Sequence, residues 1–215
     1  MGIVSGVVYI MTCLTIGTKL DFLDTEFSRK IAHMLISFWW FIVAWMSPTE
    51  HTIFWVPIII LFLFTIINNI VGYKGIMRTD GRKEYGVQCY CIAMIIFLIG
   101  AAYFDRTVSY VGVFFMPLGY GDAMAAIVGK RYGKRGYSIL GGRKTFLGNA
   151  TMFFFSLLAL VIYTGVFRCT FELYELIIIA IIATIFEAIG TYGFDNLLMT
   201  CGTWIICYFC LGIGH

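Results

Sequence analysis

Charged residues are scarce in this chain. Of its 215 residues, 13% are charged and 60% are hydrophobic, whereas soluble domains carry about 25% charged residues. A soluble fold cannot bury this much apolar surface, so the composition excludes a soluble domain and predicts an integral membrane protein. Alternating barrel strands are also absent, and long apolar runs such as TIFWVPIIILFLFTII (residues 52–67) favour membrane-spanning helices.

Several other features are missing. Neither Cys89-x-Cys91 nor Cys207-x-x-Cys210 has nearby His or Cys partners, so we interpret the seven cysteines as core thiols rather than as a metal or redox site. The first twenty residues lack a charged n-region and a cleavage site, and are expected to form a span rather than a signal peptide. No linker, low-complexity tract or internal repeat is visible, so we expect one domain over residues 1–215.

The apolar runs predict an all-α, polytopic helical membrane protein with eight transmembrane helices, although seven or nine spans would also fit. The expected spans are residues 2–20, 30–47, 52–71, 87–104, 107–129, 145–166, 171–189 and 196–214. In the fifth span, Pro117, Gly119 and Gly121 are expected to interrupt the helix.

The basic residues are distributed unevenly between the two sides of the predicted membrane. With eight spans, the loops that follow spans one, three, five and seven share one side. Every Lys and Arg except Arg106 and Arg168 falls on that side. The positive-inside rule makes this side cytoplasmic and places both termini on the opposite side.

Residues 130–144 (KRYGKRGYSILGGRK) contain six basic residues, no acidic residue and several glycines. The charge alone would serve as an orientation signal with affinity for anionic lipid headgroups. The glycines indicate more, because they let a backbone approach a polyphosphate closely and present amides to it. The segment is not a Walker A loop, since Gly142 stands where the lysine should be.

Asp122 lies near the end of the fifth predicted span, in GDAMAAIVGKRYGK (residues 121–134). Gly121, Ala125 and Gly129 form a row of small residues that lets another helix pack closely. A charge inside a span is costly and usually faces a bundle interior, a cavity or a partner. Asp122 is therefore either half of a structural ion pair with a loop lysine or a functional carboxylate for metal binding or proton abstraction.

A second group of acids lies in ATIFEAIGTYGFDN (residues 183–196). Glu187 is near the end of the seventh span, and Asp195 and Asn196 open the eighth on the same side. Asp195 would also serve as an N-cap for the last helix. We expect Asp122, Glu187 and Asp195 to converge at one depth, where such oxygen ligands suit Mg²⁺ bound together with phosphates.

The segment EFSRKIAHM (residues 26–34) places further polar groups at the start of the second span. Lys30 and His33 share one helical face, and Arg29 lies four residues before His33. This segment is either a helix start with interfacial cations and an incidental histidine, or one wall of a polar site. Together with GRKEYG (residues 81–86), these loops bring acids and bases to one membrane face, where a Mg²⁺-nucleotide would meet a lipid headgroup.

In the order of these motifs, the chain resembles the CTP-dependent polyprenol kinases, the family of phytol and dolichol kinases. The resemblance runs from residue 26 to the C-terminus. The matching positions are Arg29, Lys30 and His33; Glu84, Tyr85 and Gly86; Gly121, Asp122, Ala125, Gly129, Lys130 and Gly133; Lys144, Thr145 and Gly148; and Glu187, Asp195 and Asn196. The ordered set is more specific than any one motif.

The resemblance implies transfer of the γ-phosphoryl group of CTP to a membrane lipid alcohol, either a prenol or diacylglycerol. It implies Mg²⁺ as cofactor and membrane lipids, but no nucleic acid, as partners. The implied catalytic residues are Asp122, Lys144, Glu187 and His33. The residues implied in nucleotide binding are Arg29, Lys30, Lys130, Arg131, Gly133, Lys134, Thr145 and Gly148. Those implied in metal binding are Asp195, Asn196 and Asp122, and Asp122 has either of two roles, base or ligand.

Departures from the family pattern leave the lipid acceptor open. Thr145 and Asn149 stand where the family commonly has serine, and Ile127 stands where an acid is often found. The phosphatidate cytidylyltransferases are an alternative, because they also use CTP and have a similar Asp…Gly…Lys-Thr-x-x-Gly arrangement. Their C-terminal signature has no counterpart after Glu187. A non-catalytic transporter or assembly factor is a second alternative, although transporters usually contain inverted repeats.

Overall fold

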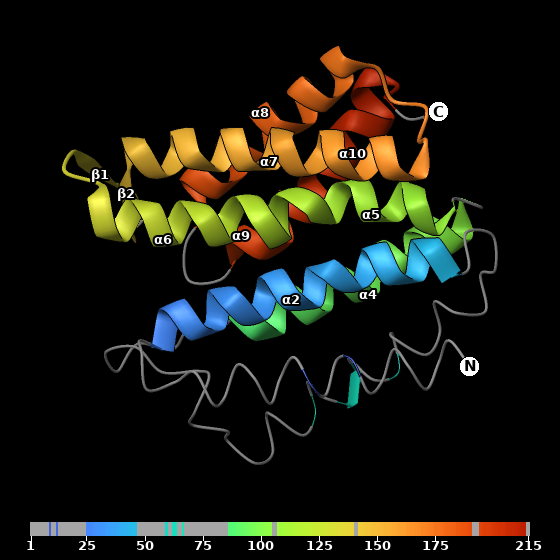
Figure 1. Ribbon diagram of the computed structural model, residues 1–215, viewed down its shortest axis with the longest axis horizontal. Helices are drawn as coiled ribbons and strands as arrows, with labels where there is room; N and C mark the ends of the chain where they lie inside the picture. The colour runs from blue at the N-terminus through green and yellow to red at the C-terminus, as the bar shows by residue number, and fades with distance from the viewer. Residues whose placement is uncertain are drawn as a thin grey trace.

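The computed structural model describes residues 25–46, 86–104, 107–139, 142–190 and 194–213, with isolated positions at 9, 12, 59, 62, 63 and 66. Long helices lie side by side in a bundle, and a small β-hairpin lies at one end of it (Figure 1). The expected helical architecture is therefore confirmed for the described residues, with the hairpin as an addition to it.

Each predicted span that falls on described residues is helical. The helices are α2 (Thr25–Met46), α4 (Gly86–Tyr103), α5 (Val108–Met116), α6 (Asp122–Tyr132), α7 (Phe146–Phe167), α8 (Leu173–Ile189), α9 (Phe194–Leu197) and α10 (Thr203–Ile205). There are also three π-helical segments in the described part of the chain: η1 (Pro117–Gly121) between α5 and α6, η2 (Leu198–Gly202) between α9 and α10, and η3 (Ile206–Cys210) after α10. The predicted spans 2–20 and 52–71 lie outside the described ranges.

Two of the described helices, Ser109–Tyr132 and Phe146–Phe167, are long and apolar enough to cross a membrane. In the first, the interruption predicted at Pro117, Gly119 and Gly121 takes the form of a π-helical turn, η1, and the helix continues through it without a break. Pro117 has no N–H to donate, and the backbone N–H of Asp122 donates to the Pro117 carbonyl oxygen. A π-turn of this kind absorbs an extra residue without ending the helix.

The row of small residues on α6 packs against α7, as the sequence predicts. A Cβ atom on Gly121 would lie 2.1 Å from the Ser156 hydroxyl oxygen, and one on Gly129 would lie 3.2 Å from the Gly148 Cα atom. The two backbones approach this closely because neither glycine has a side chain. The contact fixes the depth of Asp122 relative to the start of α7.

Aromatic side chains fill the space between the central helix and its neighbours α2 and α4. Trp40 of α2 stacks on Phe115 at a centroid distance of 4.8 Å, and Phe97 of α4 packs edge-on to the same ring at 5.3 Å. All three side chains are fully buried. These contacts hold three helices in register at the apolar end of the site described below.

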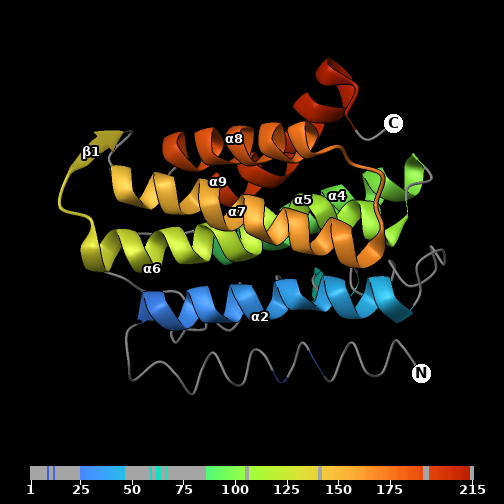
Figure 2. The ribbon, with the colours of Figure 1, turned by 45° about the horizontal axis from the view of Figure 1, so that its top comes forward.

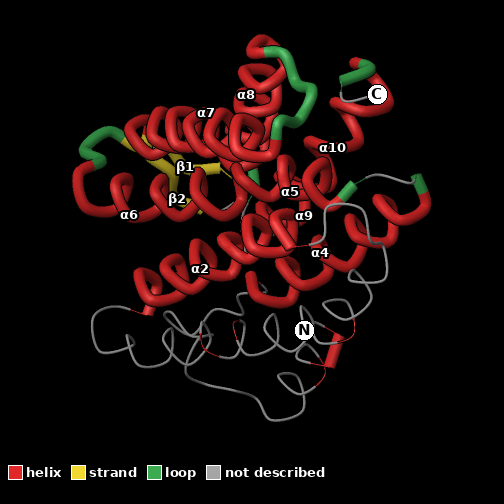
Figure 3. The backbone as a smooth tube through the Cα atoms, turned by 45° about the vertical axis from the view of Figure 1, so that its right-hand side comes forward, coloured by secondary structure: helices red, strands yellow, loops and turns green. Residues whose placement is uncertain are grey.

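The hairpin pairs β1 (Gly136–Ile139) with β2 (Gly142–Thr145) in an antiparallel register. Figures 2 and 3 show it at the junction of α6 and α7. The sequence favours a glycine loop whose amides are open to phosphate, whereas these strands use amides to pair with each other. Tyr137 lies opposite Lys144, and Ser138 lies opposite Arg143. Because side chains alternate across a strand, Lys144 and Tyr137 share one face and the exposed Arg143 lies on the other.

Candidate active site

The first half of the site is an ion pair between two helices. Lys30 of α2 donates a hydrogen bond from Nζ to the Asp122 Oδ2 atom at the start of α6. Both side chains are almost completely buried. A buried pair of this kind persists only because each charge neutralises the other. Asp122 therefore has a lysine partner, as one sequence interpretation required, but that lysine lies on a helix and not in a loop.

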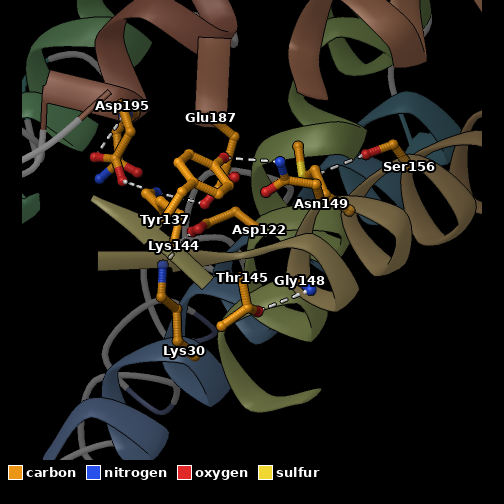
Figure 4. A network of polar contacts seen from close by, with 12 residues as sticks. Lys30, Asp122, Tyr137, Lys144, Thr145, Gly148, Asn149, Ser156, Glu187 and Asp195 are labelled. Atoms are coloured by element: carbon orange, nitrogen blue, oxygen red, sulfur yellow. Dashed lines mark hydrogen bonds and ion pairs between the residues drawn. The ribbon is translucent and has the colours of Figure 1, made fainter. Parts of the chain in front are cut away.

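The second half is centred on Lys144, the residue before the last of β2. Its Nζ atom lies 2.5 Å from Glu187 Oε1 on α8 and 3.8 Å from Asp195 Oδ2 on α9 (Figure 4). The side chains are 18%, 7% and 16% exposed, respectively. One ammonium group therefore holds together two carboxylates from the C-terminal part of the chain.

Local packing explains how these side chains meet. Thr145 caps α7 by accepting a hydrogen bond from the Gly148 N–H at 3.0 Å, and this junction places Lys144 at the start of the helix. On the other side, a Cβ atom on Gly190 would lie 2.5 Å from the Asp195 Cα atom. Glycine is required there, because it brings α9 against the end of α8 and sets Asp195 beside Glu187.

The two halves interact with each other. The Lys144 ammonium group acts electrostatically on Asp122 as well as on its own partners. Burial lowers the pKa of Lys144, but the Glu187 and Asp195 carboxylates outweigh this effect and hold its pKa above the ordinary value of a lysine. Lys144 is therefore a permanent cation at neutral pH. Asp122, Glu187 and Asp195 converge around two lysines, as the sequence predicts.

His33 lies one turn from Lys30 on α2, and it is buried and close enough to Asp122 to act on it electrostatically. Its ring stacks on Tyr90 of α4, with 4.8 Å between ring centroids and 29° between ring planes. The Tyr90 hydroxyl lies 3.3 Å from the Ser37 hydroxyl, also on α2. A small network of buried polar side chains therefore continues from the Lys30–Asp122 pair toward the apolar core.

The structure separates the other predicted cations from this centre. Lys130, Arg131 and Lys134 are exposed around the end of α6, where Arg131 lies over the Tyr132 ring. The side chain of Arg29 lies outside the described residues. Of the predicted cations, Lys30 and Lys144 are therefore the ones that the structure pairs with the carboxylates of the site.

Gly133, Gly148 and Asn196 have packing roles in the structure. A Cβ atom on Gly133 would lie 2.3 Å from the Gly129 carbonyl oxygen, and one on Gly148 would lie 2.9 Å from the Thr145 hydroxyl. Asn196 is buried, and its backbone N–H donates to Asp195 Oδ1 at 3.1 Å. All three positions thus hold Thr145 and Asp195 in place, whatever further contact they make with a ligand.

Four site-lining residues were not predicted as functional from the sequence. Two of them, Tyr90 and Ser37, extend the network around His33. The others are Tyr137 and Asn149, whose side chains are joined by a hydrogen bond of 2.7 Å from the Asn149 amide to the Tyr137 hydroxyl. This bond ties the hairpin to α7 and gives the Asn149 departure from the family pattern a structural reason. The alternation of Tyr137 and Ile139 was the available signal for a strand.

The carboxylates fit a divalent cation that arrives with a phosphate ligand. Within the described ranges, no group of three or more His, Cys, Asp or Glu side chains is close enough to hold a metal ion. Mg²⁺ in phosphoryl-transfer sites is usually held by one or two carboxylates together with substrate phosphates and water. Glu187 and Asp195, which both contact the ammonium group of Lys144, provide such a pair of carboxylates.

Comparison with known proteins agrees with the resemblance predicted from the motifs. A phytol kinase from Synechocystis sp. is 25% identical to the chain over 199 residues, which cover 88% of this chain and 82% of the relative. The chain is similar to a phytol kinase. No protein-family model matches the sequence, and no solved structure matches it.

The aligned region is long enough to contain every part of the site. At 199 residues, it is too extensive to arise from one shared motif or one shared helix. The similarity to this relative therefore extends over most of the chain.

Proposed function

We propose that the chain is a multi-pass membrane lipid kinase that transfers the γ-phosphoryl group of CTP to a lipid alcohol, giving a lipid monophosphate and CDP. The observation that carries the proposal is the convergence of two lysines, one buried and one partly buried, and three carboxylates from α2, α6, β2, α8 and α9. Phosphoryl transfer depends mainly on positioning and on charge stabilisation, and this cluster provides both.

The surface of the bundle supports a location in the membrane. Apolar side chains remain exposed along α7, among them Phe154 (60%), Ile162 (48%) and Val166 (59%). This outward face continues the length of a helix that is long enough to span a bilayer. The hairpin, which precedes the first residue of α7, would then lie at the cytoplasmic surface, where a soluble nucleotide has access to it.

In the proposed site, Lys144 binds the triphosphate, with Arg131 and Lys134 at the entrance. Mg²⁺ held by Asp195, Asn196 and Glu187 would neutralise phosphate charge when it is bound. Asp122 lies ten residues before the end of α6, which corresponds to about 15 Å of helix. It is therefore at a depth where the hydroxyl group of a lipid alcohol can reach it.

Asp122 is proposed to accept the proton of the lipid hydroxyl. Lys30, bound to the same carboxylate, would orient it and stabilise the phosphoryl group as it arrives. The proton moves from the alcohol oxygen to Asp122, the alcohol oxygen forms a bond to the γ-phosphorus, and the bond to the CDP oxygen breaks. His33, one turn away on α2, would orient the acceptor or a phosphate oxygen.

The experiment that tests the function uses purified protein in detergent with Mg²⁺ and with CTP labelled separately at the α- and γ-phosphates. Phytol, longer prenols, diacylglycerol and phosphatidate are offered as acceptors, and ATP and UTP as competing donors. The proposal requires γ-label on a lipid alcohol and release of CDP. Transfer of α-label to phosphatidate with release of pyrophosphate would show a cytidylyltransferase instead. Absence of both labels, together with absence of nucleotide binding, would favour a non-catalytic transporter.

A further inference from the structure

A stripe of buried polar side chains runs along one face of α2. Lys30, His33 and Ser37 are separated by three and four residues and therefore share a face on successive turns. They are 6%, 5% and 0% exposed, respectively. On an otherwise apolar helix, burial of three polar side chains in line is costly unless each meets a specific neighbour.

Tyr90 of α4 contacts two members of this stripe. Its ring stacks on His33, and its hydroxyl oxygen lies 3.3 Å from that of Ser37. Tyr90 is itself 3% exposed, so it reaches α2 through the interior of the bundle. The ring and the hydroxyl of one side chain thus bridge α4 to two turns of α2.

A second element, η1, packs closely against Ser37. A Cβ atom on Gly119 of η1 would lie 2.2 Å from both the Cβ and Oγ atoms of Ser37. Ser37 is therefore in contact with both Tyr90 and Gly119, and at this turn α2 has no space to move closer to η1. Gly119 lies three residues before Asp122, so the same contact sets the distance between Asp122 and the turn of α2 that carries Lys30.

We propose that Tyr90 is a positioning residue of the active site, which fixes the ring of His33 and holds α2 so that Lys30 and His33 face Asp122. The stack restricts rotation of the imidazole about its Cβ–Cγ bond, and the contact with Ser37 adds a second point of attachment one turn away. The role in turnover rests on the proposed lipid-kinase function, whereas the fixing of the imidazole does not.

A double-mutant cycle in the lipid-kinase assay tests the functional role. Loss of the stack in Tyr90→Leu should lower kcat about tenfold or more, because small misplacements of reacting groups are costly. Tyr90→Phe keeps the ring and should stay within about threefold of wild type. In the His33→Gln background, Tyr90→Leu should lower kcat further by no more than about twofold. A change of that size is within the usual scatter of double-mutant cycles. Losses that multiply would overturn the proposal.

Tyr110 of α5 provides a matched control. It is also a buried tyrosine, 8% exposed, but its ring stacks on Phe171, near the start of α8 and away from the site. The fold-decrease in kcat caused by Tyr110→Leu should be the same in the wild-type and His33→Gln backgrounds, as expected for two independent positions. Coupling between Tyr110 and His33 as strong as that of Tyr90 would show that the cycle reports general destabilisation, and would also overturn the proposal.

A second readout does not depend on activity. The chain contains three histidines, so ¹⁵N-histidine labelling gives a spectrum in which His33 is assigned by His33→Gln. Tyr90→Leu should shift the His33 imidazole nitrogen resonances through a changed tautomer or orientation, whereas Tyr110→Leu should leave them unchanged. Shifted resonances in a protein without kinase activity would reject the proposed function and keep the positioning. Unshifted resonances in Tyr90→Leu would reject the positioning itself.

Discussion

At the scale of single residues, the site depends on how buried charges are paired. Among the described residues, Lys30 has one carboxylate partner and Lys144 has two. The pairs differ in position, since Asp122 lies within the length of a continuous helix and Lys144 lies in the hairpin. This difference suggests separate roles, with Asp122 toward the lipid and Lys144 toward the nucleotide.

The first prediction concerns Asp122. Asp122→Asn keeps the shape of the side chain but removes the charge that pairs with Lys30 and the ability to accept a proton. We expect the turnover rate to fall on the order of 10²-fold or more, as for loss of a general base. Turnover of γ-labelled CTP with phytol measures this, on protein shown by circular dichroism to be folded at the assay temperature, because loss of a buried ion-pair partner also lowers stability. A folded variant with nearly full activity would contradict the role.

The second prediction concerns Lys144. Lys144→Ala should raise the CTP concentration for half-saturation roughly 10- to 100-fold, because hydrogen bonds to charged groups contribute about 1.5–3 kcal/mol. Arg143→Ala is the matched control, since Arg143 precedes Lys144 on the same strand but faces outward. Its saturation curve should stay within about twofold of wild type, as for surface substitutions. Equal effects of the two substitutions would argue for a general effect of positive charge.

At the scale of elements, close helix packing decides the geometry of the site. The central helix from α5 to α6 contacts α2 at Gly119 and α7 at Gly121, and both glycines belong to η1. The π-turn thus places two close contacts directly before Asp122. Small residues at these points let polar side chains on neighbouring helices reach one another.

The third prediction tests this packing. Gly119→Ala should separate α2 from η1, weaken the Lys30–Asp122 pair and lower kinase activity about tenfold or more, because overpacking displaces the backbone. Ser37→Gly in the same chain should restore activity in part, because the nearest remaining Ser37 atom, Cα, would be 3.7 Å from the new methyl group.

The control for this prediction is Gly165→Ala on α7, where a Cβ atom would meet nothing within 4 Å. That variant should retain activity and gain stability of about 0.5–1 kcal/mol, as expected for alanine in place of glycine in a helix. If Ser37→Gly fails to improve the activity of Gly119→Ala, the loss has another cause than contact between these two residues.

At the scale of the whole molecule, the site lies at one end of the bundle. The hairpin lies at the start of α7, and the connection from α7 to α8 lies at its other end (Figure 1). The distribution of Lys and Arg predicts that the hairpin end is cytoplasmic. The proposed nucleotide site and the cytoplasmic pool of nucleotide would then be on the same side.

The fourth prediction tests this orientation. Ser138→Cys in β1 and Thr170→Cys between α7 and α8 are both at exposed positions. They are introduced separately into a chain in which Cys13, Cys169 and Cys210 are replaced by serine. A membrane-impermeant maleimide should label Thr170→Cys in intact cells and Ser138→Cys only in inverted vesicles. The opposite pattern would reverse the predicted orientation, and labelling of both in intact cells would exclude α7 as a span.

The helical segments of the described residues and the chemical types of the site residues could be predicted from the sequence, whereas the hairpin could not. Apolar runs specify helices because their backbone groups must pair internally in an apolar environment, and acids and bases are visible wherever they interrupt such runs. The spacing of Gly121, Ala125 and Gly129 also predicted that another helix packs closely on that face, and the structure identifies this helix as α7.

Which lysine pairs with which carboxylate could not be predicted from the sequence and follows from the packing of the helices. Lys30 and Asp122 are 92 residues apart, and Lys144 and Glu187 are 43 apart, so their pairing depends on how whole helices pack. The register of the hairpin likewise determines which of two neighbouring cations faces the site: Lys144 points inward and Arg143 points outward. Tyr90 was missed for this reason: an isolated tyrosine on an apolar helix gives no sign of its role until α2 is set beside it.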